Sequence, residues 1–474
     1  IVRFIMEPKW MVFIIVSFGM FATTLEGTIV LVVYPVISEF FNTTASTVAW
    51  IGIGYFLSSC SLLMTMGWLC DLWGGKRVYV SGTIIFTITL LFISFSQNVY
   101  HIILLRSLQG IGAAMVISSS TALIASQFSR EERGKVFGLS GAVVGLGLGL
   151  GPLIGGLLID FIDWKAVFYT RVPLSIICLL LSVKIIDQNI TKKEIKLDLL
   201  GSLYLFILLG SLLFVISQIT ILGYLSPLII VSLLLFIIFT PLFIYQEIHS
   251  EFPVVQINMF KNPVFLVSII TLLLIYQSWN TIGYITPFVT THGMGYSIVF
   301  SGLLLSTFSL VRIAVAPIAG RLTDIIGSKI LIFSSVILLI ISLILLSFAT
   351  MYGASLEIGL VLALAGIAFG LFDPANNTAV VNSVPEDRLG MASASIATAR
   401  QTGLAIGIAF SSGIFGSRLA HYNQSAIQNT QVENINSNLV LLAANDTIML
   451  SAIVCALTLF VFIFWLRGNF LKDA

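Results

Sequence analysis

Apolar residues in this 474-residue chain occur in long stretches rather than in alternating or amphipathic patterns. A run of about 20 apolar residues with few charges is typical of a transmembrane helix. We therefore predict an all-α integral membrane protein with fourteen spans. The predicted spans are Trp10–Pro35, Val48–Leu69, Val78–Phe95, His101–Ala125, Val136–Ile159, Val167–Ile186, Leu199–Ile219, Pro227–Tyr245, Pro263–Thr290, Ile298–Leu322, Ile330–Thr350, Leu356–Val380, Met391–Gly416 and Asp446–Arg467. The first has no small-residue cleavage site, so it is predicted to be a retained span.

Composition excludes a soluble protein. Charged residues make up 9% of the chain, against roughly 25% in soluble domains. The four cysteines, Cys60, Cys70, Cys178 and Cys455, have no disulfide-framework or metal-ligand spacing, which favours small core residues. No nucleotide-binding loop and no acid–base–nucleophile set is present, so we expect neither an enzyme nor a bound cofactor or metal.

Basic residues orient the spans. With the amino terminus in the cytoplasm, only Lys165 and Arg418 among the loop lysines and arginines fall outside. This asymmetry predicts that both termini are cytoplasmic. The longest external segment, His421 to Asn445, is rich in Asn, Gln and Ser and is predicted to be a solvated loop.

Two charged turns occupy corresponding positions in the two halves of the chain. Gly67–Arg77 joins spans two and three, and Gly320–Lys329 joins spans ten and eleven. The repeat predicts two six-span bundles separated by two extra spans. The domains would be 1–187, 188–250 and 251–474.

Four motifs, together with this plan, resemble the major facilitator superfamily, and most closely its fourteen-span drug:proton antiporters of the multidrug-efflux type. They are the Gly67–Arg77 turn, Arg106-Ser107-Leu108-Gln109-Gly110 in span four, the glycine run ending Gly151-Pro152-Leu153-Ile154-Gly155-Gly156 in span five, and Leu25-Glu26-Gly27-Thr28 in span one. The resemblance covers essentially the whole chain and implies the major facilitator fold.

In the charged turns, glycines permit a tight reversal, and Asp71 can cap the following helix or pair with a basic residue. The resemblance implies a conformation-dependent latch between Asp71 and Arg133 that holds the outward-open state. The residues that we assign to this latch are Gly67, Asp71, Gly75, Lys76, Arg77, Arg133 and Asp324. The alternative is a loop that only sets topology.

Charges inside the spans are the candidates for proton coupling, for which we select Glu26, Arg106 and Asp373. A buried carboxylate such as Glu26 could exchange a proton, face a cationic substrate, or pair with a neighbouring arginine. Glu26 stands where the family usually has Asp. Arg106 either takes part in coupling, as the resemblance implies, or forms a structural ion pair or reaches the outer surface. Asp373 could pair with Arg400 or with Arg312, for structure or for coupling.

The substrate cavity is assigned to Glu26, Gln109, Arg171, Arg312 and Arg400. Arg171 stands where the family commonly has Asn, and it either faces the cavity or snorkels outward. Four arginines against two acids within the spans favour an anionic, zwitterionic or lipid-like substrate over a cationic one.

In span five, Gly141, Gly145 and Gly149 share one helix face, and Gly147, Gly151 and Gly155 share another. We predict a gating interface, with plain packing as the alternative. The family's antiporter motif corresponds to Gly147, Gly151, Pro152, Gly155 and Gly156, and the resemblance implies exchange of substrate for protons.

The predicted function is a proton-coupled antiporter in the plasma membrane that exports amphiphilic drugs or related small molecules by alternating access. The alternatives are an exporter of lipid-like or other organic anions and a transporter-like membrane sensor. The expected partners are the amphiphilic substrate, protons and the lipid bilayer, with no nucleic acid, and the expected form is a monomer.

Overall fold

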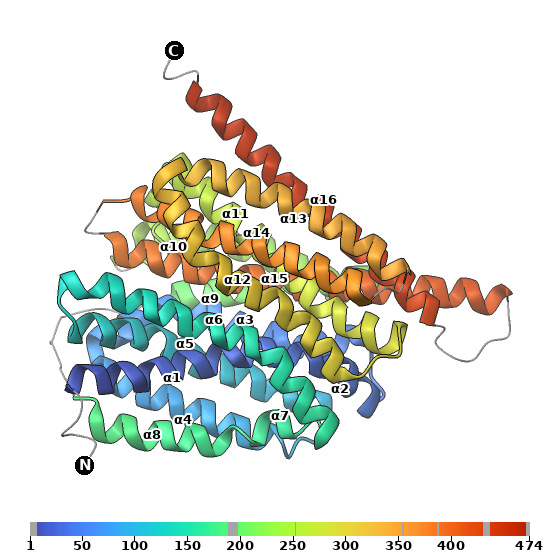
Figure 1. Cartoon of the computed structure of the whole chain (residues 1–474), viewed down its shortest axis with the longest axis horizontal. Coiled ribbons are helices and arrows are strands. Elements are labelled where there is room, and N and C mark those ends of the chain that lie inside the picture. The colour runs from blue at the N-terminus through green and yellow to red at the C-terminus, as the bar shows by residue number, and fades with distance from the viewer. Residues whose placement is uncertain are drawn as a thin grey trace.

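A computed structural model describes residues 7–187, 198–251, 253–352, 355–385, 388–429 and 437–470. Within these residues, fourteen helices are long and apolar enough to cross a membrane, and they correspond one to one with the predicted spans. Figure 1 shows them as two layers that lie against each other along their length.

The first layer is an N-terminal bundle whose central helices are α1, α3, α5 and α6. Its elements are α1 (Pro8–Ile29), the 3-10 turn η2 (Val30–Val33), α2 (Tyr34–Phe40), α3 (Ala45–Trp73), α4 (Gly75–Ile93), α5 (Val99–Gln127), α6 (Arg130–Phe161), α7 (Ala166–Tyr169) and α8 (Val172–Ile185). The first span is one nearly continuous helical run from Pro8 to Phe40.

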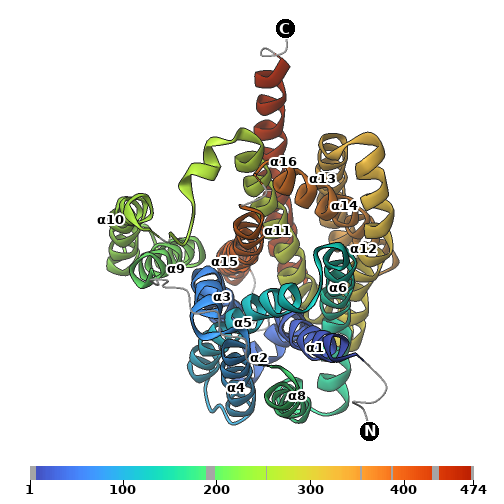
Figure 2. The same ribbon diagram turned by 90° about the vertical axis from the view of Figure 1, so that its left-hand side faces the viewer.

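The second layer is a C-terminal bundle, which follows a hairpin of two long helices. The hairpin is α9 (Leu199–Leu222) and α10 (Pro227–His249). The bundle comprises η3 (Ile257–Lys261), α11 (Pro263–Phe288), the π-helical turn η4 (Val289–Gly293), α12 (Ile298–Ile326), α13 (Ser328–Tyr352), α14 (Ser355–Asn382), α15 (Leu389–Asn429) and α16 (Ser437–Phe470). Figure 2 shows the hairpin standing beside the two bundles.

Side-chain caps define several helix starts. Thr44, Asn98 and Ser297 each accept a bond from the backbone amide three residues ahead, at 3.2, 2.9 and 3.3 Å. These caps satisfy amides that the first turn of a helix leaves without a partner. Short polar connections therefore suffice to end one span and begin the next.

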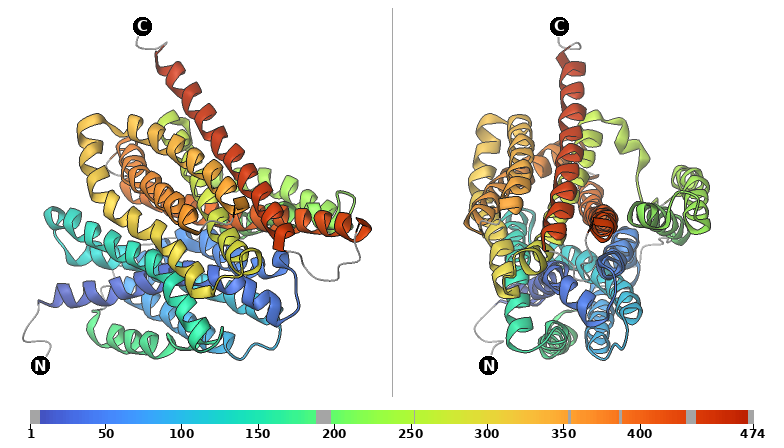
Figure 3. Two further views of the ribbon diagram at one scale, coloured as in Figure 1. Left: turned by 45° about the vertical axis from the view of Figure 1, so that its right-hand side comes forward. Right: turned by 90° about the vertical axis from the view of Figure 1, so that its right-hand side faces the viewer.

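The polar segment His421–Asn445 is the main departure from the predicted elements. The loop prediction is wrong for most of it, because α15 continues to Asn429 and α16 begins at Ser437. Figure 3 shows these helices extending past the rest of the molecule. Asn, Gln and Ser are compatible with helix once an apolar span has nucleated it, so composition alone gave the wrong answer.

The two bundles touch at the end away from the charged turns. There, the Tyr284 hydroxyl of α11 donates to the Ala45 carbonyl at 2.6 Å, and the Val299 amide of α12 donates to Asp160 Oδ2 of α6 at 3.2 Å. Toward the charged turns, a Cβ at Gly67, Gly141 or Gly320 would meet nothing within 4 Å. Polar contacts between the bundles thus close the end away from the charged turns.

Candidate functional site

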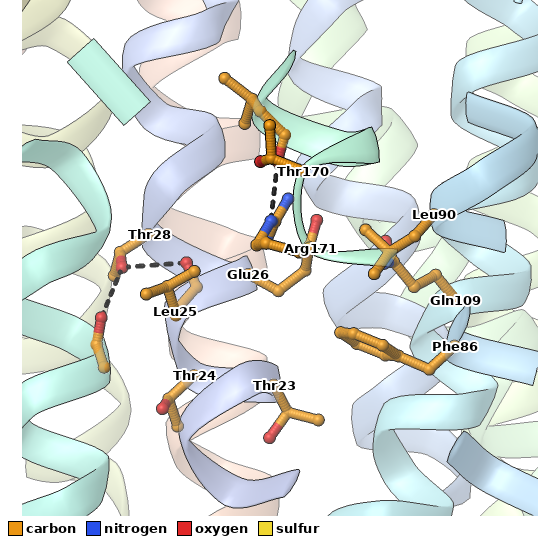
Figure 4. A network of polar contacts seen from close by, with 12 residues as sticks. Thr23, Thr24, Leu25, Glu26, Thr28, Phe86, Leu90, Gln109, Thr170 and Arg171 are labelled. Atoms are coloured by element: carbon orange, nitrogen blue, oxygen red, sulfur yellow. Dashed lines mark hydrogen bonds and ion pairs between the residues drawn. The ribbon is translucent and has the colours of Figure 1, made fainter. Parts of the chain in front are cut away.

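Glu26 lies at the centre of the N-terminal bundle, fully buried on α1. Its Oε1 pairs with Arg106 of α5, and its Oε2 pairs with Arg171 at the start of α8. Figure 4 shows Glu26 and Arg171 close together, with Gln109 on the neighbouring helix. The pairing alternative for Glu26 is thus realised, with two arginines rather than one.

Arg106 is held on several sides. It donates to Gln109 Oε1 at 2.6 Å and to the Ile51 carbonyl at 3.3 Å, and its guanidinium lies 4.3 Å from the centre of the Tyr55 ring. The side chain is 1% exposed, so the alternative in which it reaches the outer surface is wrong. Hydrogen bonds and a cation–π contact lower the cost of burying this charge.

Arg171 is placed by a break in the sixth span. Helix α7 ends at Tyr169, and α8 starts at Val172 with Pro173 in its first turn. Proline suits a helix start because the first amides have no helical partner. In the break, Arg171 Nε donates to the Val167 carbonyl at 2.7 Å while the guanidinium turns inward to Glu26. The outward-snorkelling alternative is therefore wrong.

A second charged cluster lies in the C-terminal bundle. Asp373 of α14 pairs with Arg312 of α12. The Tyr276 hydroxyl of α11 donates to the two Asp373 oxygens at 3.1 and 3.3 Å and accepts from Arg312 at 2.9 Å. The sequence left Arg400 and Arg312 as possible partners of Asp373, and in the structure the partner is Arg312.

Arg400 of α15 has a different environment. Its guanidinium lies 5.2 Å from the centre of the Tyr276 ring, and its buried Nε has no hydrogen-bond partner among the described residues. Each bundle thus holds one carboxylate, two arginines and a tyrosine. Because the arginines outnumber the acids in both clusters, each cluster carries one net positive charge when the carboxylate and both arginines are charged and the tyrosine is neutral.

Aromatic residues complete the C-terminal cluster, and sequence reasoning missed them. Trp279 and Phe308 stack with ring centres 3.6 Å apart, and Phe369 meets Phe308 edge-on at 5.1 Å. Tyr55 and Tyr276, under the arginines, were also missed. Aromatic residues are common in apolar spans, so only their helical register relative to Arg106, Arg312 and Asp373 could have signalled them.

The charged turns share one backbone geometry. Gly74 and Gly327 both adopt positive φ, 87° and 84°, between consecutive spans, a conformation that favours glycine. Gly74 is the N-cap of α4 and has no side chain with which to cap that helix, and both alternatives for Asp71, capping and pairing, stay predictions. The side chain of Arg133 lies outside the described residues, and the latch stays a prediction. Asp324 and Arg77 are exposed, and Lys76 donates to the Val183 carbonyl at 2.8 Å.

Helix α6 lies between α1 and α12, and its glycines permit both contacts. A Cβ at Gly147, Gly151 or Gly155 would meet α1, at Thr24, Thr28 and Ile29. A Cβ at Gly145, Gly149 or Gly156 would meet α12, at Ile313, Ser309 and Ile298. Gly302 of α12 packs directly against the Pro152 carbonyl. The antiporter-motif segment therefore forms part of the interface between the bundles.

Two helical bundles around buried charges are typical of a membrane transporter. The profile of the Major Facilitator Superfamily matches residues 16–408. The chain belongs to that superfamily.

Relatives and solved structures agree with this assignment. The riboflavin transporter RibZ of Clostridioides difficile is 28% identical over 98% of both chains. The multidrug resistance protein Stp of Mycobacterium tuberculosis is 26% identical over 86% of this chain and 76% of its own. The crystal structure of a bacterial homolog of the lysosomal transporter Spinster, in an inward-facing conformation, superposes with a TM-score of 0.73 at 12% identity, covering 98% of both chains. The crystal structure of the nucleoside transporter NupG superposes with a TM-score of 0.66 at 13% identity, covering 97% of this chain and all of NupG.

Proposed function

We propose that the protein is a proton-coupled antiporter that exports an amphiphilic small molecule across the plasma membrane. The supporting observation is Glu26, a fully buried carboxylate held between Arg106 and Arg171. A proton on Glu26 would cancel its charge and leave two arginines without a counter-ion. Proton binding would thereby change how α1, α5 and α8 attract one another.

Alternating access would follow from rocking of the two bundles about their α6–α12 interface. With both termini in the cytoplasm, the closed end would be extracellular, and the state described would face inward. Proton uptake by Glu26 from outside and release inside would then accompany outward movement of the substrate. Multidrug resistance proteins among the relatives support export.

The charge balance favours a second candidate, an exporter of organic anions. Arg400 has no acidic partner among the described residues, and both clusters carry excess positive charge. Such a cavity would attract a carboxylate or phosphate group. Riboflavin is a third probe to include, because RibZ is named for it.

The test is transport by protein reconstituted in liposomes, with ethidium, riboflavin and a fluorescent fatty acid as probes. A pH gradient should drive wild-type accumulation of at least one probe, with proton movement reported by pyranine. Glu26→Gln should lose this gradient-driven accumulation but keep exchange of labelled for unlabelled substrate, which needs no net proton transfer. Glu39→Gln, an exposed acid on the same span, is the matched control.

Two results would contradict the proposal. Undiminished accumulation by Glu26→Gln would remove Glu26 from coupling. Absence of substrate-dependent flux for all three probes would instead favour the sensor alternative. The probe that the wild type accumulates decides between a cationic and an anionic cargo.

A further inference from the structure

The base of the α9–α10 hairpin brings together two acids, Asp198 and Glu247. Asp198 is the N-cap residue of α9, and Glu247 lies in the last turn of α10. The antiparallel arrangement places both at the end that carries the charged turns, where they are only 8% and 4% exposed. The sequence had placed Glu247 beyond the end of its span.

Each acid has one oxygen engaged and one unengaged. Asp198 Oδ1 accepts from the Gly201 amide at 2.7 Å and from Gln246 Nε2 at 3.0 Å. Glu247 Oε2 accepts from the Val255 amide at 2.7 Å, which ties the hairpin to the segment leading into the C-terminal bundle. Asp198 Oδ2 and Glu247 Oε1 are buried and have no partner among the described residues.

The two unengaged oxygens converge over Gly201. A Cβ at that glycine would lie 2.8 Å from Asp198 Oδ2 and 2.8 Å from Glu247 Oε1. The distance between Asp198 Oδ2 and Glu247 Oε1 is therefore at most twice 2.8 Å. The missing side chain of Gly201 leaves the space in which they approach each other.

Charged groups on the neighbouring elements do not neutralise the two acids within the described part of the chain. The charged or titratable candidates are His249 at the end of α10, Glu251 in the connection, Lys261 in η3, Asp71 in the last turn of α3, and Arg400 and Arg418 on α15. No ion pair among the described residues joins any of them to Asp198 or Glu247. Near this end, α3 meets α9 through a contact between the hydroxyls of Thr65 and Ser202.

We infer that Glu247 binds a proton at Oε1, the oxygen that faces Asp198 Oδ2 across Gly201. Two carboxylates this close and this buried repel each other when both are charged, and an unpartnered buried oxygen is costly. A proton on Glu247 removes this repulsion and gives Oε1 a hydrogen to donate toward Asp198 Oδ2. The site is separate from Glu26 and does not depend on the direction or cargo of transport.

Loss of this proton at alkaline pH would leave two like charges at the base of the hairpin. Repulsion would separate the start of α9 from the end of α10. Because Glu247 also holds the Val255 amide, the connection between the hairpin and the C-terminal bundle would loosen. The two acids thus make the attachment of the extra helices sensitive to pH.

Infrared spectroscopy of the full chain in lipid nanodiscs can detect the proton directly, through the C=O stretch of a protonated carboxylic acid. At neutral pH the wild type should show this band, and raising the pH should remove it. Glu247→Gln should abolish it, and Gly201→Ala should do the same by pushing the oxygens apart without altering either acid. Two controls should keep the band: Glu251→Gln, at an exposed acid, and Gly210→Ala, where a Cβ meets only Leu57 at 3.4 Å.

A band that is absent from the wild type at neutral pH, or unchanged in Glu247→Gln, overturns the inference. A band that disappears when sodium is added at constant pH indicates a metal-cation site and overturns it as well. The apparent melting temperature of the wild type provides a measurement that needs no variant. The folded protein holds a proton that the unfolded chain releases, so the melting temperature should fall as the pH rises through the range in which the band is lost.

Discussion

Arg400 differs from the other three arginines within the spans because no acid pairs with it in the described residues. Arg106, Arg171 and Arg312 are each bound to a carboxylate, whereas Arg400 contacts the face of Tyr276. An arginine in this state keeps its full capacity for a bidentate bond to a carboxylate or phosphate. It is therefore the residue best prepared to bind an anionic group of the substrate.

Arg400→Gln should weaken binding of an anionic substrate and leave a neutral or cationic one nearly unaffected. A hydrogen bond to a charged group contributes about 1.5–3 kcal/mol, which corresponds to roughly a tenfold to hundredfold rise in Kd. The two Kd values are measured by binding of a fluorescent fatty acid, the anionic ligand, and of ethidium, the cationic ligand, to the purified variant. Arg418→Gln, which changes a half-exposed arginine elsewhere on α15, is the control. Equal losses for both ligands would argue against a direct contact with the anion.

At this scale the sequence identified the charged residues but not their partners. Glu26, Arg106, Arg171, Arg312, Asp373 and Arg400 are conspicuous because a charge in an apolar span needs a reason. Glu26 and Arg171 are 145 positions apart, so only the packing of α1 against α8 reveals their pairing. The arrangement of Arg106 and Gln109 on one helix face could be predicted, since residues three apart are neighbours on a helix.

Among the elements, α6 shows most clearly how a short-range pattern determines packing. The four-residue spacing of its glycines predicts two smooth faces, and both are in contact, one with α1 and the other with α12. The sequence could not tell which neighbours they meet, because two glycine faces without side chains carry no partner-specific feature. The structure separates a face inside one bundle from a face between bundles.

Gly151→Ala should destabilise the N-terminal bundle. Its Cβ would collide with Thr28 Oγ1 and lie 3.0 Å from the Ile29 backbone nitrogen, and backbone cannot move aside cheaply. Overpacking of this kind typically costs about 1–3 kcal/mol, so the apparent melting temperature should fall. In Gly141→Ala, on the same helix, the added Cβ would meet nothing within 4 Å. The melting temperature of this variant should equal that of the wild type. Equal melting temperatures for the two variants would show that α1 and α6 are less closely packed than described.

Over the whole molecule, polar contacts between the bundles at the end away from the charged turns characterise the conformational state. The closed end depends on a few polar contacts between bundles, among them the bond from Tyr284 to the Ala45 carbonyl. Fourteen spans and their grouping follow from hydropathy and from the repeated turns. The conformational state cannot be predicted in this way. It reflects a balance between two arrangements of the same helices, whose free energies differ by only a few kcal/mol.

Tyr284→Phe should shift that balance away from the state described, because it removes a bond that only the closed end permits. A hydrogen bond contributes about 0.5–1.5 kcal/mol net, so the population ratio should change by roughly twofold to tenfold. Spin labels at Trp73→Cys and Ile325→Cys, exposed positions at the charged-turn ends of α3 and α12, report the separation of the bundles, and the four native cysteines are buried. Tyr79→Phe is the matched control, because Tyr79 donates to the Ile15 carbonyl at 2.8 Å within one bundle. The long-distance population should decrease in Tyr284→Phe alone. An equal decrease in both variants would mean that general loosening, rather than the contact between bundles, controls the conformation.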